Sequence, residues 1–203
     1  MKLRRLEMLL EGVSDFETPH AALEQYMTPA SLAARVVHHA FLAGDIQDLA
    51  ICDLGCGTGI LGIGAALLGA FRVDGYDGDL SALEICAHNA QKFSVKMHCE
   101  LFMLDTSSTT TLPAHYDTIL MNPPFGAQNT HADRPFIDCA LESADVVYGI
   151  FNAGSIEFLK SYTKERATIR DQFAARIPVK RRFFFHTQDV VEIPVEVLIF
   201  DRI

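Results

Sequence analysis

Blocks of apolar and polar residues alternate along the chain and predict helices and strands in turn. Residues 1–26 read as a helix-rich lead-in. Apolar residues at 3.6-residue spacing over 32–41 then predict a helix that begins near Thr28-Pro29, where threonine can cap it, and ends at Gly44.

From residue 49 onward, short apolar runs typical of strands alternate with helical patterns. Strands are expected at 49–53, 72–77, 95–101, 116–121, 146–151, 173–179 and 190–200, and helices at 60–70, 80–91, 133–143 and 155–170. The last two strands have no helix between them and predict an antiparallel hairpin at one sheet edge. The order predicts an α/β, Rossmann-like domain over 1–203, with a mostly parallel seven-stranded sheet and helices on both faces.

Composition limits the class of protein further. A chain of 203 residues, 49% of them hydrophobic, suffices for one domain with a substantial core. No apolar run reaches the roughly 18 residues of a membrane helix, so we expect a cytoplasmic protein without membrane contact. Five cysteines and eight histidines are scattered without metal-ligand spacing, and we expect no metal.

The net charge of −9 argues against a surface that binds nucleic acid all over. Residues 6–150 carry five basic and 19 acidic side chains, whereas residues 151–203 carry nine basic and seven acidic ones. Contact with a nucleic acid is therefore expected from the chain ends, or from a partner that supplies positive charge.

A glycine-rich run follows the first predicted strand: Asp53-Leu54-Gly55-Cys56-Gly57-Thr58-Gly59-Ile60. Glycines at this position allow a tight turn and let a ligand lie against bare backbone. The run also fits the dinucleotide pattern G-x-G-x-x-G, which alone is weak. A carboxylate two residues before the first glycine favours S-adenosylmethionine, because it can organise the loop and the cofactor's ammonium group.

Two further aspartates complete the expected cofactor site. Asp77, at the end of the second predicted strand, can accept both ribose hydroxyls, although NAD-binding proteins share this position. Asp105, after the third strand, is expected to bind the adenine amino group, but an ordinary loop aspartate is an equal alternative. The loop is expected to contribute Gly55, Gly57, Gly59 and Ile60.

The motif Asn122-Pro123-Pro124-Phe125 follows the fourth predicted strand and indicates the reaction class. The lone pair of an exocyclic adenine amine is delocalised into the ring, so a methylating site needs acceptors that localise it. The side-chain oxygen of Asn122 and the carbonyl of Pro123 can each accept one N–H bond, while Pro124 stiffens the turn. Phe125 offers a face for a flipped-out base. A rigid turn without chemistry is the structural alternative.

The sequence resembles the methyltransferase-like protein 5 family, small archaeal and eukaryotic enzymes that form N6-methyladenosine in small-subunit ribosomal RNA. The likeness covers nearly the whole chain. It rests on Phe16-Glu17, Pro19, Leu23-Glu24-Gln25-Tyr26 with Thr28, Asp53 to Gly57, Met121 to Gly126, Phe185-His186, Val191-Glu192-Ile193 and Glu196-Val197.

The resemblance implies that residues 1–45 cover the cofactor, with Gln25 and Thr28 folded over it, and that 46–203 form the core. It also implies ribosomal RNA as the substrate and a small zinc-binding activator protein on the edge strand Val95–Leu101. An edge protected by its own Lys96 and Glu100 is an equal alternative.

A basic and aromatic run differs from the family pattern, in which a lysine run follows the Phe-His pair. Here the charge precedes the aromatics, as Lys180-Arg181-Arg182-Phe183-Phe184-Phe185-His186. We expect Lys180, Arg181, Arg182, Phe185 and His186 to contact RNA, with arginines on phosphate and aromatics on bases. A strand end whose aromatics belong to the core is equally compatible with the run.

Other functions remain open at this point. N5 methylation of a glutamine in a translation factor would use a similar corner, usually with tyrosine in place of Phe125, and suits the acidic charge. A cofactor-binding scaffold in ribosome assembly without activity would leave Asn122 and Phe125 unused. A DNA methyltransferase lacks a recognition domain here, and a dehydrogenase gives the Asn-Pro-Pro-Phe motif no task.

Overall fold

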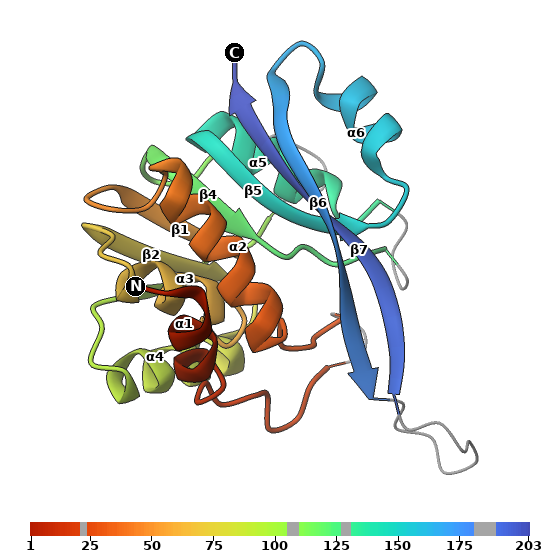
Figure 1. Ribbon diagram of the computed structural model, residues 1–203. Coiled ribbons are helices and arrows are strands. Elements are labelled where there is room, and N and C mark those ends of the chain that lie inside the picture. The colour runs from red at the N-terminus through yellow and green to blue at the C-terminus, as the bar shows by residue number, and fades with distance from the viewer. Residues whose placement is uncertain (21–23, 105–109, 127–130, 181–189) are drawn as a thin grey trace.

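The computed structural model describes residues 1–20, 24–104, 110–126, 131–180 and 190–203. Its centre is a seven-stranded sheet in the order β3-β2-β1-β4-β5-β7-β6 (Figure 1). The strands are β1 (Ala50–Leu54), β2 (Arg72–Asp77), β3 (His98–Leu101), β4 (Tyr116–Met121), β5 (Ala144–Asn152), β6 (Ala167–Lys180) and β7 (Val190–Arg202).

The first five strands run parallel, whereas β7 pairs antiparallel with β5 and β6 pairs antiparallel with β7. The predicted fold class, including the C-terminal hairpin, is confirmed. β2 lies beside β1 on one side and β4 lies beside it on the other. The order of the strands in the sheet therefore reverses direction between β1 and β4. Ligands of such sheets bind outside the carboxyl ends of the strands at this reversal.

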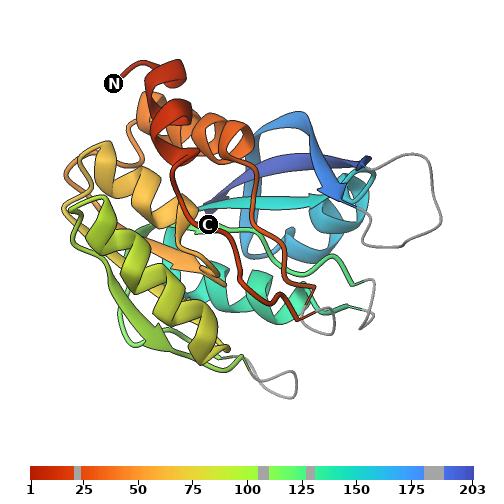
Figure 2. The same ribbon diagram turned by 90° about the horizontal axis from the view of Figure 1, so that it is seen from below.

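Helices cover both faces of the sheet. They are α1 (Leu3–Leu10), α2 (Ala30–Ala43), α3 (Ile60–Leu67), α4 (Leu80–Lys92), α5 (Arg134–Ser143) and α6 (Ile156–Thr163). One core cluster joins α1, α2 and α3 to the sheet, and a second joins α5 and Leu159 of α6 to its other face. Figure 2 shows α1 and α2 on one side of the sheet and α5 on the other.

The predicted helix over 155–170 is wrong in its second half. α6 ends at Thr163, and β6 begins at Ala167, which pairs with Arg202 of β7. The β-branched pair Thr168-Ile169 joins the edge of the sheet instead, because pairing with β7 outweighs the weak helical periodicity of this segment. The hairpin is therefore longer than predicted.

The N-terminal prediction needs two corrections. Among the described residues of 1–26, the helix is Leu3–Leu10, and the described parts of 11–29 form an irregular strap that crosses toward the α5 side of the sheet (Figure 2). Thr28 does not cap α2: Pro29 is the N-cap residue, and no side chain caps this helix end. Gly44 ends α2 with φ of 89°, as predicted.

The edge strand is confirmed at one side of the sheet, although β3 begins at His98 and not at Val95. Within the described ranges, none of the helices combines the length and the apolarity that crossing a bilayer requires.

Candidate active site

A cavity of about 330 Å³ opens where β1, β2 and β4 end, at the point where the strand order reverses. This volume lies in the range of small-molecule sites. The predicted site residues in its lining are Gln25, Thr28, Asp53, Gly55, Gly57, Ile60, Asp77, Asn122 and Pro124. Gly59, Pro123 and Phe125 are not part of the lining, and Asp105 lies outside the described residues.

The glycine loop turns tightly between β1 and α3. Gly55 and Gly57 have φ of 70° and 52°, a region that side chains disfavour. A Cβ on Gly55 would lie 2.8 Å from the Phe136 ring, and one on Gly57 would lie 3.0 Å from the Phe16 ring. Because nothing larger than glycine fits, the backbone itself forms one wall of the cavity. Gly59 is the N-cap residue of α3, and its contact with a cofactor stays a prediction.

Asp53 is buried at the end of β1, and its carboxylate accepts the Gly62 N–H at 2.7 Å. This bond ties the strand end to the first turn of α3 and so fixes the glycine loop between them. The Gly62 contact is consistent with the predicted role of Asp53 in organising the loop. A contact between Asp53 and the ammonium group of a cofactor stays a prediction.

Burial raises the pKa of the Asp53 carboxyl to about 8, against the opposing effect of the Gly62 hydrogen bond. Since this native pKa lies above the unfolded value of about 3.9, the folded protein retains the proton between them. The free energy of unfolding should therefore fall with rising pH, by about 1.4 kcal/mol per unit from this group between roughly pH 4 and 8. Asp53→Asn keeps an acceptor for Gly62 and should remove that slope. Urea unfolding across this range measures it, and equal slopes in both proteins would contradict the assignment.

Asp77 joins β2 to the glycine loop. One of its carboxylate oxygens accepts the Gly57 N–H at 2.8 Å, and the other accepts the Asp79 N–H at 3.0 Å. A carboxylate oxygen has two lone pairs, so each can accept one further bond. Burial raises the pKa of Asp77, which favours a ligand that restores hydrogen bonds to the charged form.

Gln25 reaches the same corner from the strap. Its side-chain nitrogen donates to Asp79 at 2.6 Å, and its oxygen accepts the His20 N–H at 2.8 Å. These bonds hold the strap over the edge of the cavity, where the sequence predicted Gln25 to lie.

The Asn122 amide is held at both ends by the strap. Its nitrogen donates to Thr28 Oγ1 at 2.9 Å, and its Oδ1 accepts from the Tyr26 hydroxyl at 3.2 Å. Burial raises the pKa of Tyr26 well above its ordinary value, so the hydroxyl keeps its proton and donates. In this arrangement the amide oxygen faces Tyr26 and the amide nitrogen faces Thr28. One lone pair of Oδ1 remains for a further donor.

Phe125 is positioned by three further contacts. Its backbone N–H donates to Glu24 at 2.8 Å, its carbonyl accepts from Asn152 of β5 at 3.2 Å, and its ring centroid lies 5.6 Å from that of Tyr26. Strap, β4 and β5 therefore meet at the Asn-Pro-Pro-Phe corner.

Glu24, Tyr26 and Asn152 are positioning residues that the sequence did not predict. The first two belong to the Glu-Gln-Tyr-x-Thr element, so the signal was present, but only Gln25 and Thr28 were given roles. The sequence also did not predict the apolar wall of the cavity, which has no motif: Phe16, Phe102, Met103, Leu104 and Phe136.

Removing the Thr28 hydroxyl, which accepts from the Asn122 nitrogen, should let the amide group rotate out of position. Thr28→Val keeps the shape of the side chain but loses the hydroxyl, and should lower kcat about tenfold, in line with one hydrogen bond of ~1.4 kcal/mol. The KM for the methyl donor should stay unchanged, and Thr28→Ser should restore kcat. Steady-state kinetics of the three proteins test this, and a valine variant with wild-type kcat would contradict it.

The cavity fits S-adenosylmethionine on chemical grounds. Asp77 has free acceptor positions for ribose hydroxyls, Gly55 and Gly57 present bare backbone, and Phe102 and Leu104 supply apolar surface. When bound, this cofactor supplies a methyl group on a sulfonium. Among the described residues, no three His, Cys, Asp or Glu side chains are placed to hold a metal ion.

The predicted RNA-contacting run gains no structural description. Arg181, Arg182, Phe185 and His186 lie outside the described residues, and Lys180 is described only as the last residue of β6.

Comparison with known proteins identifies the family to which the chain belongs. The model of the methyltransferase small domain family matches residues 34–144. The rRNA N(6)-adenosine-methyltransferases METTL5 of Danio rerio and Mettl5 of Drosophila melanogaster are each 32% identical to the chain, covering 98% and 97% of it and 99% and 94% of their own lengths. A candidate RNA methyltransferase from Pyrococcus horikoshii superposes with a TM-score of 0.88 at 33% identity, over 100% of this chain and 98% of that one. The chain therefore belongs to the methyltransferase small domain family and, within it, to the METTL5 family, as a class I methyltransferase that uses S-adenosylmethionine.

Proposed function

We propose that this protein methylates N6 of an adenosine in RNA, and that the RNA is that of the small ribosomal subunit. The METTL5 relatives are named for methylation of adenosine in rRNA, and they align over nearly the whole chain. The observation that carries the proposal is the Asn122 amide, held with its oxygen accepting from Tyr26 and its nitrogen bound to Thr28.

An oriented amide oxygen is what an adenine amine requires. Oδ1 of Asn122 accepts one N–H of the amine and the Pro123 carbonyl accepts the other, which directs the nitrogen lone pair toward the methyl group. Both acceptors also stabilise the positive charge that develops on nitrogen. Pro123 and Pro124 restrict the turn, so the acceptors keep their positions without reorganisation. The ring of Phe125 stacks on the extruded base.

Labelled methyl transfer to separated fractions tests the substrate class. The enzyme is incubated with S-adenosylmethionine carrying a labelled methyl group and with unmodified ribosomal small subunits, and label is then measured in purified RNA and in protein. We expect label in RNA. Label in the protein fraction alone would instead support methylation of a protein side chain, and label in neither fraction would support the scaffold.

The basic and aromatic run, which lies between β6 and β7 in the chain, is proposed as a further RNA contact. The support is its sequence alone, Lys180, Arg181 and Arg182 beside Phe185 and His186. Replacing the three basic residues by Gln should weaken RNA binding and reduce its salt dependence. RNA affinity measured at two salt concentrations tests this, and an unchanged salt slope would assign the run to the core.

The free edge of β3 is proposed as the surface for a small zinc-binding activator protein. β3 ends the sheet, with Leu101 45% exposed and Met103 68% exposed just beyond it. Backbone groups on such an edge can pair with a strand of a partner. A mixture with a candidate activator should elute as one complex on a sizing column, and Leu101→Asp should separate it. Two separate species with the unaltered chain would support an edge protected by Lys96 and Glu100.

A further inference from the structure

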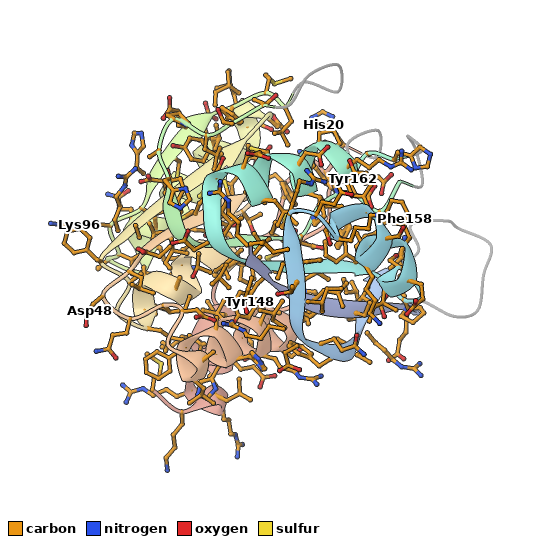
Figure 3. The ribbon with its side chains drawn as sticks, turned by 90° about the horizontal axis from the view of Figure 1, so that it is seen from above. His20, Asp48, Lys96, Tyr148, Phe158 and Tyr162 are labelled. Carbon is orange, nitrogen blue, oxygen red and sulfur yellow. The ribbon has the colours of Figure 1, made fainter. Side chains whose placement is uncertain are left out.

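A cluster of aromatic and guanidinium groups lies between α5 and α6, outside the cavity. The rings of Phe158 and Tyr162 stack with centroids 5.4 Å apart and planes 24° apart. The Arg134 guanidinium lies over both rings, 5.2 Å from the centroid of Phe158 and 5.6 Å from that of Tyr162. Figure 3 shows both aromatic side chains on α6 at the surface of the molecule. We name Arg134, Phe158 and Tyr162 the α5–α6 aromatic cluster.

The chain connects this cluster to the Asn-Pro-Pro-Phe corner from two directions. Arg134 stands between Ala132 and Phe136, which both line the cavity. Asn152, which binds the Phe125 carbonyl, precedes Phe158 by only six residues, and Phe158 lies in the first turn of α6. The cluster is therefore close in the chain to two segments that build the site, the cavity-lining residues around Phe136 and the end of β5.

The polar groups of the cluster leave Arg134 available for a ligand. Within the described part of the chain, Arg134 has no carboxylate within ion-pair distance, and its Nε is buried without a hydrogen-bond partner. Asp138 of α5 is already bound to Arg166 at 2.7 Å and to the Tyr162 hydroxyl at 2.8 Å.

Phe158 is not needed to hold α6 in place. Leu159 is fully buried in the core, and the Asp138 contacts tie Tyr162 and Arg166 to α5. Phe158 is 40% exposed and stands outside the core clusters. An exposed ring backed by a second ring and flanked by an unneutralised guanidinium has the composition of a stacking site for an unpaired nucleobase.

We propose that the α5–α6 aromatic cluster binds an unpaired nucleotide of the RNA that neighbours the target adenosine, with the base on Phe158 and its phosphate on Arg134. This inference rests on the proposed function, since it assumes a single-stranded RNA substrate. It adds a subsite that distinguishes an adenosine in an open segment from one inside a duplex, whose neighbouring bases stay stacked in the helix.

Phe158→Ala tests the subsite, with Phe71→Ala as the matched control. Phe71 is 81% exposed and precedes the amino end of β2, so it lies at the end of the sheet opposite the cavity. The readouts are the Kd for a fluorescently labelled single-stranded RNA oligonucleotide containing adenosine, the KM for that RNA, and the Kd for S-adenosylmethionine. Thermal melting confirms that each variant is folded.

We expect Phe158→Ala to raise the Kd and KM for RNA about tenfold, since stacking of one base accounts for a factor of this order. Cofactor affinity should not change, Phe71→Ala should bind RNA as the wild type does, and Phe158→Trp should restore binding. Wild-type RNA affinity in Phe158→Ala, or an equal loss in Phe71→Ala, overturns the subsite. If the proposed function is wrong, the wild-type protein will not methylate any RNA. The oligonucleotide affinities of the variants test the subsite independently of that result.

Discussion

Asn122→Ala should reduce methyl transfer by about 10² to 10³-fold while leaving S-adenosylmethionine binding close to wild type. The loss is of the size seen when one preorganised polar group is removed from a charge-developing transition state. Asn122 contributes its amide oxygen at the end of β4, and its bonds to Tyr26 and Thr28 hold that oxygen in place before substrate arrives. Single-turnover rates measure the effect on the chemical step, and calorimetric titration measures cofactor binding.

Two controls separate chemistry from folding in this variant. The alanine leaves the Tyr26 hydroxyl and Thr28 without their partner, so a modest loss of stability is expected and is followed by thermal melting. Thr28→Val disturbs the same contact but retains the amide, and should fall between wild type and Asn122→Ala in rate. An Asn122→Ala enzyme with the full rate would remove the Asn-Pro-Pro-Phe corner from the mechanism.

Asp77→Ala should mainly affect cofactor binding and not the rate of methyl transfer. We expect the Kd for S-adenosylmethionine to rise about 10²-fold, because hydrogen bonds to a charged group contribute ~1.5–3 kcal/mol. The carboxylate also accepts from Gly57 and Asp79, so its loss loosens the glycine loop as well as removing the ribose contact. At saturating cofactor, the remaining methyl transfer should recover toward the wild-type rate.

Asp77→Asn is the control for that prediction. The amide oxygen can still accept the Gly57 N–H, whereas the amide nitrogen cannot accept the Asp79 N–H, so the variant keeps one of the two backbone contacts and part of the ribose contact. Calorimetric titration should therefore place its Kd between those of the wild type and the alanine variant. Equal affinity in all three proteins would exclude Asp77 from the cofactor site.

Local sequence patterns predicted the parts of the site that are continuous in the chain. The glycine loop and the Asn-Pro-Pro-Phe corner each follow a strand, and parallel strands in this order bring them to one end of the sheet. The contacts that orient the corner are long-range: Tyr26 and Asn122 are 96 positions apart, and Glu24 and Phe125 are 101 apart. No periodicity or spacing reports such a pair, because it depends on how the strap crosses the sheet.

The errors in secondary structure have a similar origin. Residues 164–170 carry a weak helical pattern, yet Ala167 to Ile169 pair with β7, a strand some 30 residues later in the chain. The strap was predicted as part of a helix-rich lead-in, but the side chains of Glu24 and Gln25 are engaged by the active-site corner and by Asp79. In both cases a tertiary contact outweighs local propensity.

The central claim is that the Asn-Pro-Pro-Phe corner presents an adenine amine for methylation, and nucleoside analysis tests it most directly. Unmodified small-subunit RNA is incubated with S-adenosylmethionine and either the wild-type enzyme or Asn122→Ala, then digested to nucleosides and separated by mass and retention. The account predicts N6-methyladenosine with the wild-type enzyme and a trace or none with the variant. A methyl group on another nucleoside, or equal N6-methyladenosine from both proteins, would contradict it.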